Sequence, residues 1–139
     1  MGQQQLLLVI LVTIIVGIAT VVAINTFGSA ADSANLDAVR QDMGSIAASA
    51  QGYYMKPAML GGGGRDFTGI TFNDIAFGGT NNGADQAWNE NGVYVISAAG
   101  ATSFTLTAHP ASDMTNAPAE GETATTPIVA TVLPDAISF

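Results

Sequence analysis

An apolar run from Leu6 to Ile24 constrains this chain more than any other feature of the sequence. Only Thr13 and Thr20 interrupt the run, and the first charged residue is Asp32. At about 1.5 Å per residue, a helix over this run would be nearly 30 Å long, which matches the hydrocarbon thickness of a bilayer. We therefore predict a membrane-spanning length of helix joined to a small soluble domain, and we expect the function to depend on that combination.

Composition limits the rest of the chain to one small acidic domain. The sequence has 139 residues and a net charge of −8, with eleven acidic side chains against Arg40, Lys56 and Arg65. So few cations argue against nucleic-acid binding, which needs several of them against phosphates. Cysteine is absent, which excludes disulfides, thiolate metal sites, cysteine nucleophiles and covalently attached c-type haem.

The first five residues carry no Lys or Arg, although signal peptides and membrane spans usually have basic flanks. We expect that a basic leader has already been removed, and a late start at Met1 within a longer precursor is the second explanation. Cleavage of a signal peptide near Ala30 or Ala31 stays open as an alternative, because small residues surround that point.

Beyond the apolar run, the pattern becomes that of an amphipathic helix from about Asp32 to Met55. Apolar residues recur there at intervals of three and four, which places them on one face of a helix. Pro57 ends the pattern and no proline precedes it, so we predict a single helix of about 50 residues. The stripe expected to pack against the head consists of Leu36, Val39, Met43, Ile46, Ala50 and Tyr53.

Four consecutive glycines, Gly61 to Gly64, mark a change from helix to an irregular connector. A phosphate-binding loop would need Lys, then Ser or Thr, and then a helix, whereas Arg65-Asp66-Phe67 follows here. We therefore interpret the glycines as a flexible or tightly turned link through which the chain folds back on its helix.

Three later runs have the alternation or the β-branched content of strands, namely residues 92–98, 102–108 and 127–133. Residues 98–101 should join the first two runs as a hairpin, and the polar segment 112–126 should be an exposed loop. The predicted fold class is α+β, a long N-terminal hydrophobic helix with a small C-terminal antiparallel β-sheet head packed on its second half. The predicted domains are a hydrophobic helix at 1–30 and a head at 31–139, the head comprising an amphipathic helix at 31–56, a glycine-rich connector at 57–70, and a loop and β-sheet at 71–139.

The sequence offers no pattern of a catalytic site or of a resident cofactor, so we expect no enzyme activity. The single histidine, His109, has no second His or Cys with which to form a zinc or haem site, and we expect it to lie in a loop. No serine lies in a Gly-x-Ser-x-Gly motif of the kind that indicates a hydrolase.

A glycine-rich segment at residues 74–91 contains many Asn, Asp and Glu side chains, whose oxygens are calcium ligands. The spacing is not that of an EF-hand, and the same residue types form turns, which is the favoured interpretation. Asp74, Asp85 and Glu90 are kept as weak calcium candidates. Trp88 is expected to anchor this loop to the domain.

Gln3, Gln4 and Gln5 stand at the edge of the apolar run, where unpartnered amides would be costly in lipid. Either they lie among lipid headgroups, or they hydrogen-bond to a neighbouring subunit in an assembly.

An uncharged apolar N-terminus that continues into an amphipathic helix and a small β-rich head resembles the type IV pilin superfamily. The resemblance is specific over residues 1–54 and architectural beyond them. It implies that a prepilin peptidase removes a short basic leader, for which Gly2 is the cleavage candidate, and that the new terminus, Met1 or Gln3, is methylated. Gln5, or Leu7 if Gln3 is the terminus, stands where the family usually has glutamate.

The resemblance also implies a role as the major subunit of an extracellular pilus-like filament. Such a subunit is inserted in the inner membrane, and the pilus assembly machinery then adds it to a homopolymer at the cell surface. The alternatives are a pseudopilin of a type II secretion or DNA-uptake machine and a single-pass membrane-anchored surface protein. The residues expected to make subunit contacts are Gln3, Gln4, Gln5, Leu7, Ile10, Leu11, Ile14, Gly17, Ile18 and Val21.

Overall fold

The computed structural model describes residues 2–139, so Met1, one of the two predicted mature termini, lies outside the described residues. The chain divides into two units after Ala34, whereas the predicted boundary lay after residue 30. The first unit is helical throughout its described length. It is the N-terminal part of α1, which runs from Gly2 to Met55 as one helix.

The continuity of α1 follows from its composition. No proline occurs within it, and the hydroxyls of its three threonines donate to the carbonyl four residues earlier, Thr13 to Val9 over 2.7 Å for example. The prediction of one uninterrupted helix is therefore confirmed. Pro57, which follows α1, cannot donate a backbone hydrogen bond and disfavours a helical conformation at the residue before it.

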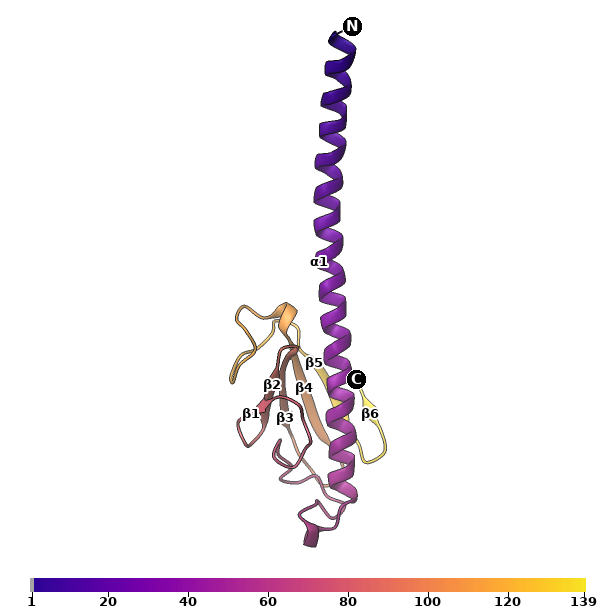
Figure 1. The fold of residues 1–139 in the computed structure, drawn as a ribbon. Coiled ribbons are helices and arrows are strands. Elements are labelled where there is room, and N and C mark those ends of the chain that lie inside the picture. The colour runs from indigo at the N-terminus through magenta and orange to yellow at the C-terminus, as the bar shows by residue number, and fades with distance from the viewer. Residues whose placement is uncertain (1) are drawn as a thin grey trace. The chain divides into compact units, whose positions relative to one another are not determined.

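The second unit, residues 35–139, contains the C-terminal part of α1 and a six-stranded antiparallel sheet (Figure 1). The strands pair in sequence order, each with the next, so the sheet is a meander. Two short 3₁₀ helices accompany it, η1 at Ala58–Leu60 and η2 at Ala111–Asp113. The strands are β1 (Thr80–Asn81), β2 (Gln86–Asn89), β3 (Gly92–Ser97), β4 (Phe104–Pro110), β5 (Ile128–Val132) and β6 (Ile137–Ser138).

The core of this unit lies between α1 and one face of the sheet. Tyr94 and Ile96 of β3, Leu106 of β4 and Val132 of β5 belong to one buried cluster with residues of α1. Phe67 and Phe72, from the segment between α1 and the sheet, and Phe104 of β4 belong to the same cluster. The rings of Phe67 and Phe104 meet edge to face, with 5.2 Å between their centroids. The α+β fold with an antiparallel sheet on the second half of the helix is thus present as predicted.

The glycine-rich connector turns the chain back along the end of α1. The amide of Gly63 donates to the carbonyl of Tyr53 over 2.8 Å, and that of Arg65 donates to the carbonyl of Tyr54 over 2.7 Å. Gly61 and Gly64 have φ of 79° and 60°, values that glycine adopts without strain. The connector therefore satisfies carbonyls that the helix end would leave open. Of the two predicted forms, it is the tightly turned one.

Two predictions for the sheet need correction. Trp88 lies in β2 and not in a loop, and none of the strands β1, β2 and β6 was predicted. His109 lies within β4, where it pairs with Val93 of β3, and only 9 % of its surface is exposed. Strands of two to four residues carry too little periodicity to be recognised locally, and they form here because a longer neighbour supplies their hydrogen bonds.

Candidate functional site

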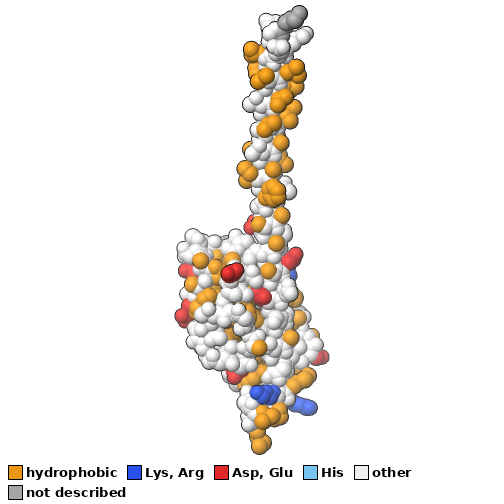
Figure 2. Space-filling view, viewed as in Figure 1, with side chains coloured by type: hydrophobic (Ala, Val, Ile, Leu, Met, Phe, Trp, Pro, Cys, Tyr) orange, Lys and Arg blue, Asp and Glu red, His pale blue; other side chains and the backbone are white. Residues whose placement is uncertain are grey.

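The N-terminal part of α1 presents many apolar side chains to its surroundings, from Leu6 to Phe27 (Figure 2). From Leu6 to Ile24 the large apolar residues are between 49 % and 66 % exposed, and Phe27 is 76 % exposed. This helix is long and apolar enough to cross a membrane, and none of its most apolar stretch is buried within the protein. The predicted contact residues Leu7, Ile10, Leu11, Ile14, Ile18 and Val21 all belong to this exposed set.

The threonine hydroxyls of this part of α1 are satisfied within the helix. The hydroxyls of Thr13, Thr20 and Thr26 each donate to a backbone carbonyl of the same helix. An isolated hydroxyl would oppose transfer into an apolar environment, and these hydrogen bonds remove most of that penalty. The stretch is therefore suited to burial in lipid or among other apolar helices.

The remaining sequence-predicted residues of this region lie at the helix start and within the apolar stretch. Gly2 is the first residue of α1, and Gln3, Gln4 and Gln5 follow it in exposed positions. Gly17 has no atom within 4 Å of where a Cβ would lie. Its bare backbone allows close approach by another helix.

The predicted stripe on the second half of α1 is buried at its centre and partly exposed at its ends. Val39, Met43 and Ile46 have no exposed surface, and neither has Ala50. Leu36 is only half-buried and does not belong to the core, so its prediction as a packing residue is corrected. Tyr53 is partly buried and packs against the edge of the cluster.

A buried polar network, which the sequence did not indicate, joins α1 to the sheet. Oδ2 of Asp42 accepts hydrogen bonds from the Tyr94 hydroxyl at 2.7 Å, from Nδ2 of Asn89 at 2.8 Å and from Nδ2 of Asn91 at 2.9 Å. Asn89 and Asn91 belong to the tight turn that joins β2 to β3. One carboxylate on the helix thus accepts hydrogen bonds both from the turn region of the β2–β3 hairpin and from β3.

The network fixes the protonation of its members. Burial alone raises the pKa of Asp42, but the three hydrogen bonds outweigh it and hold the pKa below its usual value. Burial raises the pKa of Tyr94, and so do the hydrogen bond to Asp42 and the negative charge of Asp42. The carboxylate therefore stays ionised and the tyrosine stays protonated as its donor.

The signal that could have located this hairpin is Asn at the first and Gly at the fourth position of a tight turn, here Asn89 and Gly92. Asn89 pairs with Gly92, so only Glu90 and Asn91 form the turn. Gly92 is also required for space, because a Cβ there would overlap the carbonyl oxygen of His109 on β4.

His109 takes part in a second cross-link, between β4 and the long loop that follows it. Nδ1 of His109 accepts a hydrogen bond from the amide of Ala124 at 3.1 Å. Burial lowers the pKa of this imidazole. The neutral ring, with a free lone pair on Nδ1, is the form that this contact requires.

The three calcium candidates do not come together. Within residues 2–139, no group of three or more His, Asp or Glu side chains is placed to hold a metal ion. Oδ2 of Asp74 instead accepts hydrogen bonds from the amide and the hydroxyl of Thr71, and Oδ1 of Asp85 accepts one from Asn82. Glu90 lies in the β2–β3 turn. The contacts of Asp74 and Asp85 are those of turns, the interpretation that was favoured for this segment.

Comparisons with known proteins identify no relative. No model of a protein family, no curated protein and no solved structure matches the chain.

Proposed function

We propose that this protein is the structural subunit of an extracellular filament of the type IV pilin kind, without enzyme activity. One observation carries the proposal: α1 is a single helix whose first half is exposed and uncharged, with an apolar run from Leu6 to Ile24, and whose second half is a core element of the head. A polymer of such subunits would bury the apolar halves against one another and leave the acidic heads in water.

Packing of the apolar halves would supply the free energy of assembly. Full burial of a Leu, Ile or Val side chain contributes about 1.5–3 kcal/mol relative to water. Much of that gain is already realised in a membrane, so the specific part must come from close packing. The small residues Gly17, Ala19 and Ala23 are where helix backbones could approach one another.

A single-pass anchor that holds the head at a membrane is the competing function. It draws on the same observation that α1 is long and apolar enough to cross a bilayer. The two functions differ in whether the apolar half ends among lipids or among copies of itself.

Substitutions at Ile14, which is 54 % exposed in the middle of the apolar stretch, separate these functions. Ile14→Lys would place an unpaired charge among neighbouring helices in every subunit, at a cost of about 2.5–3.5 kcal/mol on insertion scales. Ile14→Leu conserves volume and should cost less than about 1.5 kcal/mol.

The measurement is electron microscopy of material sheared from the surface of the source cells, with a membrane blot for the subunit. We expect filaments from the wild type and from Ile14→Leu, and unassembled subunit in the membrane for Ile14→Lys. Wild-type cells with the protein in the membrane and no filaments would favour the anchor. Filaments of normal length from Ile14→Lys would show that these helices do not form the filament core.

A further inference from the structure

The end of α1 and the 3₁₀ helix after it form an exposed apolar protrusion, which we call the tip and define as residues 55–60. Met55, Met59 and Leu60 are 73 %, 97 % and 68 % exposed, although all three are large apolar residues. Figure 2 shows hydrophobic side chains gathered at the lower end of the head. Surface this apolar on a small head marks a contact site.

The tip is an ordered structure. The amides of Leu60 and Gly62 both donate to the carbonyl of Pro57, at 3.0 Å and 3.1 Å, and the amide of Gly64 donates to the carbonyl of Lys56 at 3.0 Å. A preformed protrusion loses little conformational entropy when it binds a partner.

Most of the positive charge of the chain lies in the tip or close to it in sequence. Lys56 and Arg65 are two of its three Lys and Arg residues. Within residues 2–139 the single ion pair joins the third, Arg40, to Asp37. Lys56 and Arg65 therefore have no carboxylate partner among the described residues, in a chain whose net charge is −8.

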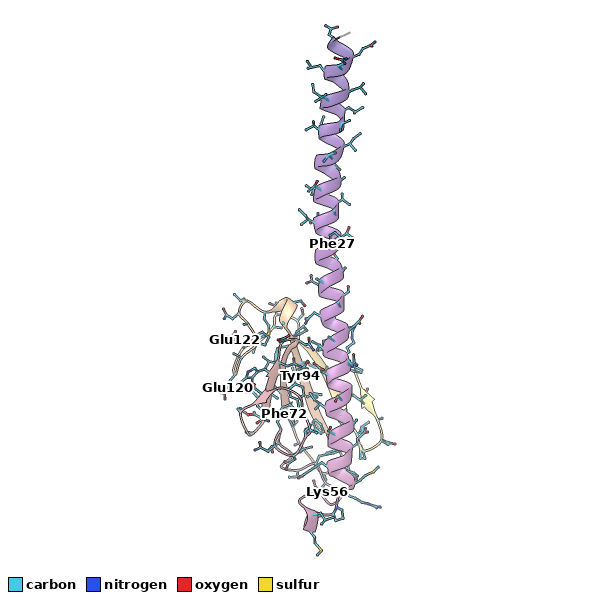
Figure 3. The ribbon with its side chains drawn as sticks, in the orientation of Figure 1. Phe27, Lys56, Phe72, Tyr94, Glu120 and Glu122 are labelled. Carbon is cyan, nitrogen blue, oxygen red and sulfur yellow. The ribbon has the colours of Figure 1, made fainter. Side chains whose placement is uncertain are left out.

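A groove of about 800 Å³ lies elsewhere on the same unit, beside β2 and the loop that follows η2. Trp88, Ala117 and Pro118 contribute the apolar part of its mixed lining, and Glu90 contributes a carboxylate. Glu120 and Glu122 follow in the same loop. The carboxylate of Glu120 accepts a hydrogen bond from Nδ2 of Asn82 at 3.2 Å, and that of Glu122 accepts hydrogen bonds from Nδ2 of Asn116 at 3.1 and 3.2 Å. Figure 3 shows these two glutamates well away from Lys56.

We propose that the tip of one copy docks into this groove on the head of a second copy. Met59 and Leu60 would pack against Trp88 and Pro118, and the cations beside the tip would face Glu120 and Glu122. The proposal deepens the proposed filament function and rests on it for its setting. Because tip and groove are different surfaces of one head, the contact is heterologous, and it can repeat from copy to copy without closing.

Charge and shape favour a second copy as the occupant. Methionine is flexible and makes favourable sulfur–aromatic contacts, which suits it to an open groove that contains an indole. Two copies of a chain of charge −8 repel each other in most orientations, whereas this orientation brings the basic end of one toward Glu90, Glu120 and Glu122 of the other. An anionic lipid surface would attract the same two cations but would be repelled by the rest of the head.

Cysteine cross-linking tests the contact directly, because the natural chain contains no cysteine. Two differently tagged full-length copies are co-expressed, one with Met59→Cys and the other with Ala117→Cys. A disulfide between the tags can then form only between molecules. The matched control pairs Met59→Cys with Ala136→Cys, which is exposed in the turn between β5 and β6. We expect the heterodimer from the first pair and at most a trace from the control.

Charge reversal tests the electrostatic part of the same contact, with the yield of the cross-link as the readout. Lys56→Glu with Arg65→Glu on the tip copy should lower the yield of the cross-link about tenfold, because like charges would then face each other. Glu120→Lys with Glu122→Lys on the groove copy should restore it. Failure of the second pair to restore the yield would count against the assigned charge pairing.

The outcomes distinguish this contact from the filament function. Cross-linking is measured both in sheared surface material and in detergent-solubilised full chain. Filaments without the specific cross-link in either preparation would overturn the docking and leave the filament function standing. A specific cross-link in detergent from cells that make no filaments would support the docking and refute the filament function. Protection of Met59→Cys from a soluble thiol reagent by phosphatidylglycerol vesicles, with no cross-link, would make the tip a lipid-binding surface and overturn the proposal.

Discussion

The hydroxyl of Tyr94 donates to the carboxylate of Asp42 over 2.7 Å, although the two residues are 52 positions apart in the chain. Tyr94 has no exposed surface and lies in β3, and Asp42 lies on α1 beside the buried Met43. The contact places a polar bond within the helix–sheet interface, where its direction fixes how strand and helix meet. Apolar packing alone has no such directionality.

Asp42→Ala should destabilise the head by about 1–3 kcal/mol, because three partly buried donors lose their acceptor together. Asp37→Ala is the control. That carboxylate is on the same helix and 80 % exposed, and its removal should change stability by less than about 0.5 kcal/mol. The measurement is denaturant unfolding of the full chain in detergent, followed by the fluorescence of Trp88, its single tryptophan. Equal stability of the two variants would mean that water replaces the network without loss.

Acidification from pH 7 to pH 5 should destabilise the head through His109. Burial depresses its pKa in the folded protein, so the unfolded chain binds a proton first as the pH falls below about 6.5. The contribution of His109 is therefore complete above that pH and is lost as the pH falls through the folded-state pKa, with a slope of at most about 1.4 kcal/mol per pH unit.

His109→Gln should flatten this dependence, because His109 is the only histidine in the chain. The slope between pH 7 and pH 5 is the readout, and it does not depend on how stable the variant is at pH 7. A second loss is expected below about pH 4 in both proteins, where Asp42, with its lowered folded-state pKa, must be protonated. An unchanged slope in His109→Gln would assign the effect between pH 7 and pH 5 to other groups.

Ile46→Asp should prevent the head from folding, because Ile46 has no exposed surface and a charge there would be buried without a partner. Ile46→Val removes one methylene group at the same place and should cost about 0.5–1.5 kcal/mol. Limited proteolysis of both full-length variants measures the difference. A head in Ile46→Asp that resists protease as well as the wild type would show that α1 does not pack through this stripe.

Two glycine-to-alanine changes should act in opposite directions. A Cβ at Gly63 would overlap the carbonyl oxygen of Asp66 and lie 2.8 Å from the ring of Tyr53, so Gly63→Ala should cost about 1–3 kcal/mol. Gly44 is exposed on α1 and has no atom within 4 Å of its Cβ position, so Gly44→Ala should stabilise the helix by about 0.5–1 kcal/mol. Melting temperatures of both variants give the signs. Destabilisation by Gly44→Ala would mean that this helix face is covered in solution.

Local patterns were sufficient for the long elements of the fold. The intervals of three and four among Val39, Met43 and Ile46 predicted the buried face of α1, since the helical repeat alone brings those residues together. The alternation in residues 102–108 likewise predicted β4, which extends from Phe104 to Pro110. Leu36 fits the same helical pattern yet is only half-buried, and the pattern alone does not make that distinction.

The apolar surface of the N-terminal half of α1 follows from the amino-acid sequence alone. The run from Leu6 to Ile24 contains no charge, so a helix over it has no polar face, and its length is close to the roughly 20 residues that a bilayer requires. The tip and the groove do not follow from local patterns. The exposure of Met59 depends on how the connector folds, and the groove beside Trp88 depends on the position of the loop after η2.

A long helix with an uncharged, largely apolar first half, followed by a small sheet, could be predicted from local patterns, because helical and strand periodicities are properties of neighbouring residues. The hydrogen bonds from Asn89, Asn91 and Tyr94 to Asp42, which lies 47, 49 and 52 positions away from them, arise only in the folded protein. The same is true of the contact between His109 and Ala124. Hydrogen bonds over such separations exist only once the strand register and the packing of the helix have placed donor and acceptor within about 3 Å of each other.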